Sequence, residues 1–450
     1  MAIATINHFI RLFADAFRAL SADVPGEDIE RLAMLIHDSM DQGRRVYHTS
    51  AHVFAMAEGL NPRQVLATLF HDVVYVQLDG GFPRRAHGVL RRVARAGKKT
   101  VVLKPIDSSD AALVACATLF GFEAGQALPL YGGLNEFLSA VVAARALGPW
   151  LPMSEVVAVA ACIEATVPFR GADRDGRETG DVLADRLRAV ARTLDLPMQE
   201  QEIDAVVHDA VALGNRDVSS FATSDPGTFL STTWELIEES NAPLSAVGVY
   251  SIREYRDALT RMETFLATLD PDHIFHRYHD SPTEAEFAEL RTAARRNIEF
   301  AGSYLGAKIT TIAVIEALAL LTGGDCPVSM LLGDIHSTRG TPDRIERFLP
   351  MIATTAPVDA QLLDVLETGR TTASASDLTV SPLTAFVYRS LGHEGTEAAR
   401  HQAARMFARQ ISPRDFISTL DRTMVRNVTK ACAQIALSRV EPLLALDAML

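Results

Sequence analysis

Apolar residues recur at three- and four-residue steps through most of the chain, with polar residues between them. This spacing places the apolar side chains on one face of an α-helix. The clearest segments are residues 2–20, 26–41, 62–77, 153–167, 199–214, 251–268, 284–306 and 412–441. The alternation of β-branched residues that is typical of strands is nearly absent, and the short stretch TVVLK at residues 100–104 is the best candidate for a strand. The pattern therefore predicts an all-α fold.

Breaks rich in glycine, proline and serine separate these segments. They include PFRGADRDGRETGD at residues 168–181, SPTE at 281–284 and TTASASDLTVSP at 371–382. After about residue 270 the helical pattern continues without an obvious cluster of chemically active residues. We therefore predict a first domain over residues 1–270, with its core at about 30–220, and a helical C-terminal domain over 271–450 for dimerisation or regulation.

Composition and net charge indicate a folded protein that is neither a general nucleic-acid binder nor a membrane binder. Of the 450 residues, 48% are hydrophobic, which is enough for a large buried core. The net charge of −13 disfavours general nucleic-acid binding and binding to an anionic membrane. The start shows no signal-peptide pattern, and the longest apolar stretch, residues 309–321, is shorter than the roughly 20 residues of a membrane span. We expect a cytoplasmic protein that does not contact the membrane.

Two histidines lie four residues apart in RRVYHTSAHV, residues 44–53. On a helix His48 and His52 would project from the same face. Two imidazoles at that spacing can share a metal ion, or one can bind metal while the other transfers protons. The alternative is a solvated helix with a chance pair, since the chain contains 13 histidines.

A second pair, His71 and Asp72, follows the apolar run in NPRQVLATLFHDVVY. Asn61 is predicted to cap this helix, with Pro62 at its first position and Gln64 completing a capping box. An imidazole and a carboxylate in so apolar a setting are costly unless they are paired or bind a cation. The dipeptide His-Asp occurs four times, but only here does it combine an apolar setting with two histidines just upstream.

Two later carboxylates also fall on apolar helix faces. Asp217 continues the spacing of the apolar residues at 206, 210 and 213, so it needs a partner unless it caps the next segment. Glu164 ends the apolar face of residues 157, 160 and 161. It is interpreted either as a general base or additional carboxylate of a site, or as part of a core salt bridge.

Together, YHTSAH, FHDVVY and the distant aspartate resemble the HD superfamily of metal-dependent phosphohydrolases, which includes the cyclic-nucleotide phosphodiesterases. The family's pattern is H…HD…D on an all-helical core, and the resemblance covers about residues 30–220. It implies that His52, His71, Asp72 and Asp217 bind a divalent metal ion. It also implies that His48 protonates the leaving oxygen.

The resemblance has one departure, because Tyr75 stands where two-metal phosphodiesterases have a histidine in HDxxH. We therefore expect one ion per chain, with Glu164 the best candidate ligand for a second. Two imidazoles and two carboxylates suit manganese, iron, zinc or magnesium.

Substrate contacts are predicted less directly. Arg170 would bind phosphate, because a guanidinium matches phosphate oxygens bidentately. Asn241, in WELIEESNAPL, would contact a base or ribose, although polarity at a helix end explains it equally well. The predicted function is hydrolysis of a small, nucleotide-like phosphoester. The alternatives are a non-catalytic nucleotide sensor on the same scaffold, a diiron oxygenase, or a structural helical protein; a homodimer fits the large apolar second half.

Overall fold

The computed structural model describes residues 4–41, 43–97, 100–129, 132–334, 343–354 and 356–450. The fold is all-α, as the hydrophobic pattern predicts: 66% of the chain is helical and the three strands are short. The chain divides into two compact units. Unit 1 comprises Met1–Ala222 and Asp270–Ala294, and unit 2 comprises Thr223–Leu269 and Arg295–Leu450.

These units differ from the predicted domains of residues 1–270 and 271–450. Residues 223–269 belong to unit 2, and residues 270–294 return to unit 1. Ile274, Phe275 and Tyr278 in the returning segment are each at most 2% exposed, and Tyr278 belongs to the hydrophobic core of unit 1. A break in the hydrophobic pattern marks a loop, and it does not show which unit the next segment joins.

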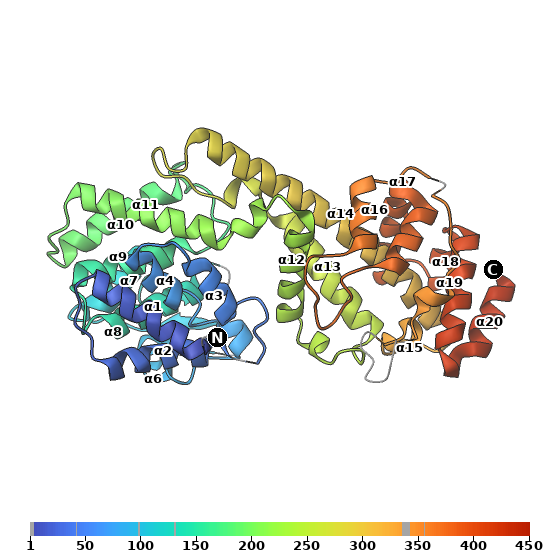
Figure 1. The fold of residues 1–450 in the computed structure, drawn as a ribbon, viewed down its shortest axis with the longest axis horizontal. Helices are drawn as coiled ribbons and strands as arrows, with labels where there is room; N and C mark the ends of the chain where they lie inside the picture. Colours follow the sequence, from blue (N-terminus) through green and yellow to red (C-terminus); the bar gives the residue numbers. More distant parts are fainter. Residues whose placement is uncertain (1–3, 42, 98–99, 130–131, 335–342, 355) are drawn as a thin grey trace. The chain divides into compact units, whose positions relative to one another are not determined.

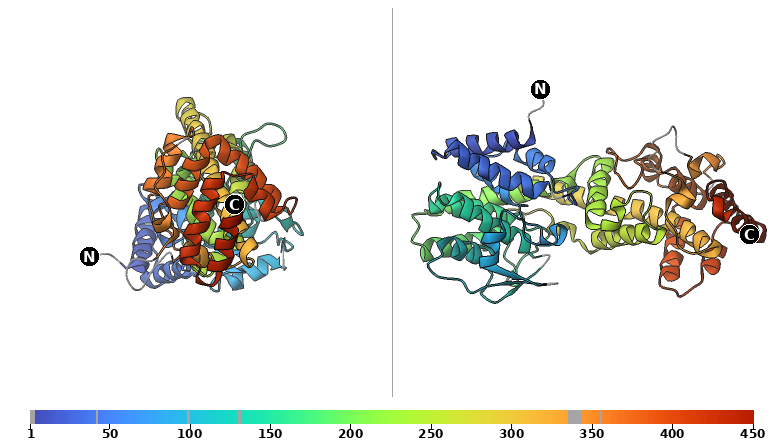
Figure 2. Two further views of the ribbon diagram at one scale, coloured as in Figure 1. Left: turned by 90° about the vertical axis from the view of Figure 1, so that its right-hand side faces the viewer. Right: turned by 90° about the horizontal axis from the view of Figure 1, so that it is seen from below.

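Unit 1 contains most of the helices in the first half of the chain, coloured blue to green in Figure 1. Their bounds are α1 (Thr5–Ala19), α2 (Gly26–Met40), α3 (Ser50–Ala57), α4 (Pro62–Phe70), α5 (Val76–Asp79), α6 (His87–Val93), α7 (Ala111–Phe120), α8 (Leu134–Leu147), α9 (Met153–Ala165), α10 (Thr179–Thr193) and α11 (Glu200–Asp217). The pair α1 and α2 lies side by side, as Figure 2 shows.

Helix α9 forms the centre of unit 1. Its residues 156–165 are all buried, and it packs against α4, α7, α8, α10 and α11. A helix that is apolar all round must be covered on every side, which explains why this segment lacks a polar face. The only acid in the buried run is Glu164.

A small antiparallel sheet lies within unit 1, in the order β1-β2-β3. Its strands are β1 (Ala94–Ala96), β2 (Val101–Leu103) and β3 (Ala127–Leu128). In register, Ala94 pairs with Leu103 and Val101 pairs with Leu128. The strand predicted in TVVLK is thus confirmed as β2.

Unit 2 is also helical. Its helices are α12 (Pro226–Ser240), α13 (Ile252–Thr268), most of α14 (Glu284–Thr322), α15 (Ser329–Leu332), α16 (Ala360–Thr368), α17 (Pro382–Phe407), α18 (Pro413–Ser418), α19 (Arg422–Ile435) and α20 (Val440–Met449). The predicted segment 412–441 is therefore three helices. Asp421 begins the second of them by accepting a hydrogen bond from the Met424 amide.

Helix α14 is longer than the predicted segment 284–306 and continues to Thr322. Among the described residues it is the one helix long and apolar enough to cross a membrane, with a window of mean hydropathy 1.7. That window is 89% buried inside the protein, as in the core helix of a folded domain. Length and composition are therefore weak evidence for a membrane span here.

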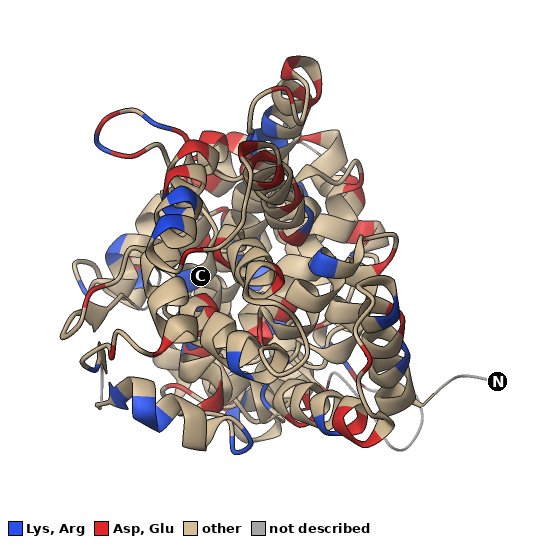
Figure 3. Ribbon diagram, turned by 90° about the vertical axis from the view of Figure 1, so that its left-hand side faces the viewer, with Lys and Arg blue, Asp and Glu red and all other residues tan. Residues whose placement is uncertain are grey.

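Charged residues of both signs are scattered over the helices and loops drawn in Figure 3. Many form short-range pairs, such as Arg188 with Asp185 at 2.9 Å. Exposed pairs of this kind contribute only about 0.2–1 kcal/mol each. The charge pattern therefore marks a solvated surface and leaves the core to carry the stability of the unit.

Candidate metal centre

Four side chains predicted to bind metal converge in unit 1. One ligand atom from each of His52, His71 and Asp72 lies within 4.8 Å of the others. Asp217 joins them, because its Oδ1 is 3.2 Å from His52 Nε2 and 3.7 Å from His71 Nε2. The remaining short distance, 2.9 Å, joins His71 Nε2 to Asp72 Oδ2.

Three helices bring these residues together. His52 lies on α3, His71 is the C-cap of α4, and Asp217 is the last residue of α11. The predicted capping box at the start of α4 is present: Asn61 accepts from the Gln64 amide, and the Gln64 side chain accepts from the Asn61 amide. This capping box defines where α4 begins, and His71 and Asp72 follow at the other end of the same helix.

The ring of His71 has one defined orientation. Its Nδ1 lies 2.8 Å from the Thr68 carbonyl oxygen. Because a carbonyl can only accept, Nδ1 carries the hydrogen and Nε2 faces the two carboxylates. A backbone bond of this kind holds many metal-binding histidines in the required tautomer.

The turn after Asp72 is held by side chains of α8. The amide of Val74 donates to Ser139 Oγ at 3.0 Å, and the amide of Val76 donates to Asn135 Oδ1 at 3.1 Å. These bonds explain why the helix predicted over residues 62–77 ends at Phe70. In a helix continuing to residue 77, these amides would instead be bonded within the helix.

Arg45 supports the same turn from the other side. It donates to the Asp72 carbonyl oxygen at 2.7 Å and pairs with Asp79 at 2.7 Å. Both side chains of the Arg45–Asp79 pair are almost completely buried. The backbone of Asp72, a proposed metal ligand, is thus hydrogen-bonded to a member of a buried ion pair.

The pKa values of His71, Asp72 and Asp217 are shifted by burial and by the charges around them. Burial opposes a charge on His71, but Asp72 and Asp217 outweigh burial and raise the pKa of His71 well above 6.5. Burial likewise opposes ionisation of the two acids, while the nearby histidines lower the pKa of Asp72 and the pKa of Asp217. The pocket therefore favours two carboxylates with positive charge between them.

A divalent cation fits this donor set. The Nε2 atoms of His52 and His71 are buried without a hydrogen bond of normal geometry, although carboxylate oxygens lie close by. Neutral imidazoles offer lone pairs at these atoms, and two carboxylates would balance a charge of +2. The cluster of His52, His71, Asp72 and Asp217 can therefore hold a metal ion.

Glu136 is a neighbour that the sequence analysis missed. It lies in the first turn of α8, where burial and the charges of Asp72 and Asp217 raise the pKa of its carboxyl to about 7. Its signal in the sequence was an acid inside the apolar run LNEFLSAVV. The same kind of signal drew attention to Glu164, which lies in the next helix.

His48 lies beside the cluster but outside helix α3, which begins at Ser50. The prediction that His48 and His52 share a helix face is therefore wrong, since bends occupy residues 46–49. The two rings nevertheless meet, with centroids 6.2 Å apart, and Tyr75 lies 4.8 Å from His48. The bend therefore brings His48 close to His52, although the two residues do not lie on one helix.

Glu164 and Arg170 pair with each other. Both terminal nitrogens of Arg170 donate to the Glu164 carboxylate, and Arg186 approaches the same carboxylate at 3.3 Å. These are the contacts of a core salt bridge, one of the two interpretations open for Glu164. Arg170 also interacts electrostatically with Glu136, which places its positive charge near the cluster.

Asn241 belongs to unit 2 and follows α12. Its amide nitrogen donates to the Ile237 carbonyl oxygen at 2.6 Å, and its oxygen accepts from Arg261 Nε at 2.8 Å. Both ends of this side chain are therefore engaged in joining α12 to α13. Its role in substrate binding stays a prediction.

Comparison with known proteins adds no relative: no family model, curated protein or solved structure matches this chain.

Proposed function

We propose that unit 1 is a divalent-metal-dependent phosphohydrolase that acts on a small, nucleotide-like phosphoester. The observation that supports this most directly is the meeting of two imidazoles and two carboxylates from three helices. The resemblance of YHTSAH and FHDVVY to the HD superfamily supplies the reaction class. A divalent ion held there would polarise a phosphoryl oxygen and acidify a water molecule.

His48 is proposed to donate a proton to the leaving oxygen. It lies next to the cluster without being one of the four proposed ligands, and it interacts electrostatically with Asp72. A positioned acid of this kind accelerates such a step by about 10²–10⁴-fold. Arg170 is proposed to attract the phosphate, although it must share its charge with Glu164.

Metal content tests the ligand set. We expect the purified protein to bind about one divalent ion per chain, and His71→Ala or Asp72→Ala to abolish that binding by removing a donor. Inductively coupled plasma mass spectrometry after gel filtration measures the ion directly. The matched controls are His279→Ala and Asp280→Ala, which change an exposed His-Asp pair. Full metal content in both site variants would reject the ligand set.

Turnover tests the chemistry separately. Protein loaded with manganese, iron, zinc or magnesium is assayed on bis(p-nitrophenyl) phosphate, p-nitrophenyl phosphate and cyclic nucleotides. We expect His48→Ala to keep its metal and to lose turnover by about 10²–10⁴-fold. Turnover of no phosphoester by metal-loaded protein would reject the hydrolase.

A nucleotide sensor on the same scaffold is the second candidate function. The position of Tyr75 against His48 favours it, because this tyrosine replaces a histidine that a two-metal hydrolase would use. Saturable nucleotide binding by metal-loaded protein, without hydrolysis, would support this alternative.

A further inference from the structure

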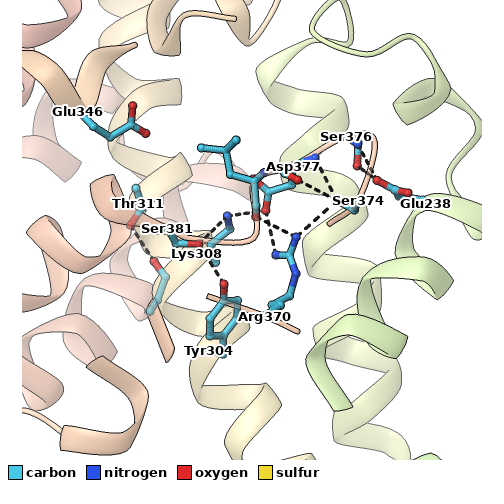
Figure 4. A network of polar contacts seen from close by, with 12 residues as sticks. Glu238, Tyr304, Lys308, Thr311, Glu346, Arg370, Ser374, Ser376, Asp377 and Ser381 are labelled. Atoms are coloured by element: carbon cyan, nitrogen blue, oxygen red, sulfur yellow. Dashed lines mark hydrogen bonds and ion pairs between the residues drawn. The ribbon is translucent and has the colours of Figure 1, made fainter. Parts of the chain in front are cut away.

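Unit 2 contains a buried polar network that the metal centre does not explain. The ammonium of Lys308, on α14, donates to Asp377 Oδ2 at 2.7 Å and to Ser381 Oγ at 3.3 Å. Arg370 donates to the same carboxylate oxygen at 3.3 Å. Figure 4 shows Lys308 and Arg370 approaching Asp377 from different sides.

The network has more positive than negative charge around Lys308. Two buried cations share the single carboxylate of Asp377, and the Arg370 side chain is completely buried. Glu238 lies at the far end of the network, where it accepts from Ser376 (Figure 4). A buried charge without its own counter-ion is costly, so an anion beside Lys308 would be stabilised.

A pocket opens beside Lys308. It contains about 430 Å³ of space between atoms, part of it open to solvent. Its apolar wall includes Ile312, Ile315 and Leu332, while Tyr255 and Lys308 contribute polar groups. Arg344, Glu346 and Asp377 also line it. Arg344 pairs with Glu346 at 2.9 Å, and the Asp377 carboxylate is engaged by both Lys308 and Arg370.

The first turn of α17 lines the same pocket. Ser381 precedes this helix without capping it through its side chain, and Pro382 has no amide hydrogen. The next two amides, of Leu383 and Thr384, are among those that a helix cannot bond internally. Ten helical residues precede the backbone break at Gly392, so this end carries the usual positive partial charge.

Tyr255 provides an independent sign of a ligand. The residue is only 5% exposed, and its hydroxyl makes no hydrogen bond of normal geometry. It has a side-chain hydrogen-bonding contact with Asp377, but this contact falls short of normal geometry, whereas a buried hydroxyl ordinarily has a full partner. Because Tyr255 lines the pocket, a group bound there would satisfy it.

We propose that this pocket in unit 2 binds a small carboxylate with a short aliphatic chain. The carboxylate would accept from the Tyr255 hydroxyl, from the free proton of the Lys308 ammonium and from amides at the start of α17. The chain would lie against Ile312, Ile315 and Leu332. A singly charged anion matches one uncompensated cation better than a phosphate dianion does.

Calorimetric titration of the full-length protein with sodium butyrate tests the proposal. Inorganic phosphate and sodium chloride at equal ionic strength are the comparison ligands. We expect saturable butyrate binding at about millimolar concentration, weaker phosphate binding and no saturation with chloride. Tyr255→Phe and Lys308→Met should each weaken butyrate binding about tenfold or more.

The matched control is Tyr388→Phe, which removes a buried hydroxyl outside the pocket. Tyr388 accepts a hydrogen bond from the Asp359 amide, so its loss should lower the unfolding midpoint and leave butyrate binding unchanged. Tyr255→Phe should do the reverse, because its hydroxyl has only the poorly aligned contact with Asp377 to lose. This contrast separates a binding role from a structural one.

Three results would overturn the proposal. They are the absence of saturable butyrate binding, butyrate binding unaffected by both pocket variants, and tighter binding of phosphate than of butyrate. Each is independent of the metal centre, because all the residues involved belong to unit 2.

Discussion

Arg45 shows how a single buried residue can organise the candidate centre without touching a ligand atom. Its guanidinium bonds the Asp72 carbonyl oxygen and pairs with Asp79, and neither partner of the pair is more than 4% exposed. Ion pairs this deep gain little over a well-packed apolar pair, because both charges lose their water. Removing only one residue of such a pair is costly, however, because the other charge then stays buried without a counter-ion.

We therefore expect Arg45→Met to lower the free energy of unfolding by about 3–5 kcal/mol, because Asp79 stays buried without a cation. The double variant Arg45→Met/Asp79→Leu should recover much of that loss. Urea titration followed by circular dichroism measures both. Equal destabilisation by the single and double variants would show that the uncompensated charge is not the cause.

His276 should make the free energy of unfolding depend on pH. Burial, with help from Arg170 and His273, lowers the pKa of its imidazole to about 4, compared with 6.5 in water. Because the folded pKa is the lower one, protonation favours the unfolded chain. The stability contribution of neutral His276 is complete above pH 6.5 and is lost as the pH falls toward 4.

The expected loss in unfolding free energy at pH 4 is roughly 3 kcal/mol. His276→Phe should flatten the stability profile between pH 6.5 and 4, since phenylalanine does not titrate. Thermal unfolding of unit 1 across that range measures the difference. A parallel decline in the variant and the natural protein would show that other groups cause the acid sensitivity.

At the scale of elements, helix α11 carries Asp217 to the centre by packing closely on α9. A Cβ atom added at Gly214 would lie 2.4 Å from the Ala165 carbonyl oxygen, which is backbone and cannot move aside. The glycine is therefore required by the approach of two helices. Asp217, three residues later, depends on that approach for its position.

We expect Gly214→Ala to push α11 away from α9, to destabilise unit 1 by about 1–3 kcal/mol and to reduce metal content. The matched control is Gly302→Ala in α14, where nothing lies within 4 Å of an added Cβ. That substitution should stabilise the protein by up to about 1 kcal/mol, because alanine favours a helix. Metal analysis and urea titration of both variants provide the comparison, and unchanged metal content in Gly214→Ala would contradict the argument.

The spacing of residues in the sequence predicted the individual helices better than it predicted the contacts between them. The cap at Asn61 and the apolar face leading to Asp217 follow from spacing alone, and the structure shows both. The end of α4 at Phe70 depends on groups far along the chain, such as Ser139, which is 65 residues from Val74. The bend at residues 46–49 has no signal in the helical spacing of His48 and His52. The polar network of unit 2 is likewise invisible in the sequence, because Lys308, Arg370 and Asp377 show no common spacing.

At the scale of the whole molecule, the chain crosses between the units at residues 222–223, 269–270 and 294–295. Unit 1 is incomplete until residues 270–294 have been made. This segment supplies Ile274, Phe275 and Tyr278 to buried positions, and the Tyr278 hydroxyl donates to Asp204 at 2.7 Å. Its backbone is also bonded by the Asn215 side chain, two residues before Asp217.

A chain ending at residue 269 should therefore fold less stably in unit 1 than a chain ending at residue 294. Removal of the Tyr278 side chain from the core of unit 1 costs about 1.5–3 kcal/mol, and the hydrogen bonds that Asn215 and Asp204 make to this segment are lost as well. We expect the longer chain to retain metal and to resist limited proteolysis within residues 1–222, and the shorter chain to lose both properties. Both truncated chains carry residues 223–269 without the rest of unit 2, so exposure of that segment cannot account for a difference between them. Equal resistance would mean that residues 270–294 lie on unit 1 without stabilising it, and the candidate centre would then be complete within the first 222 residues.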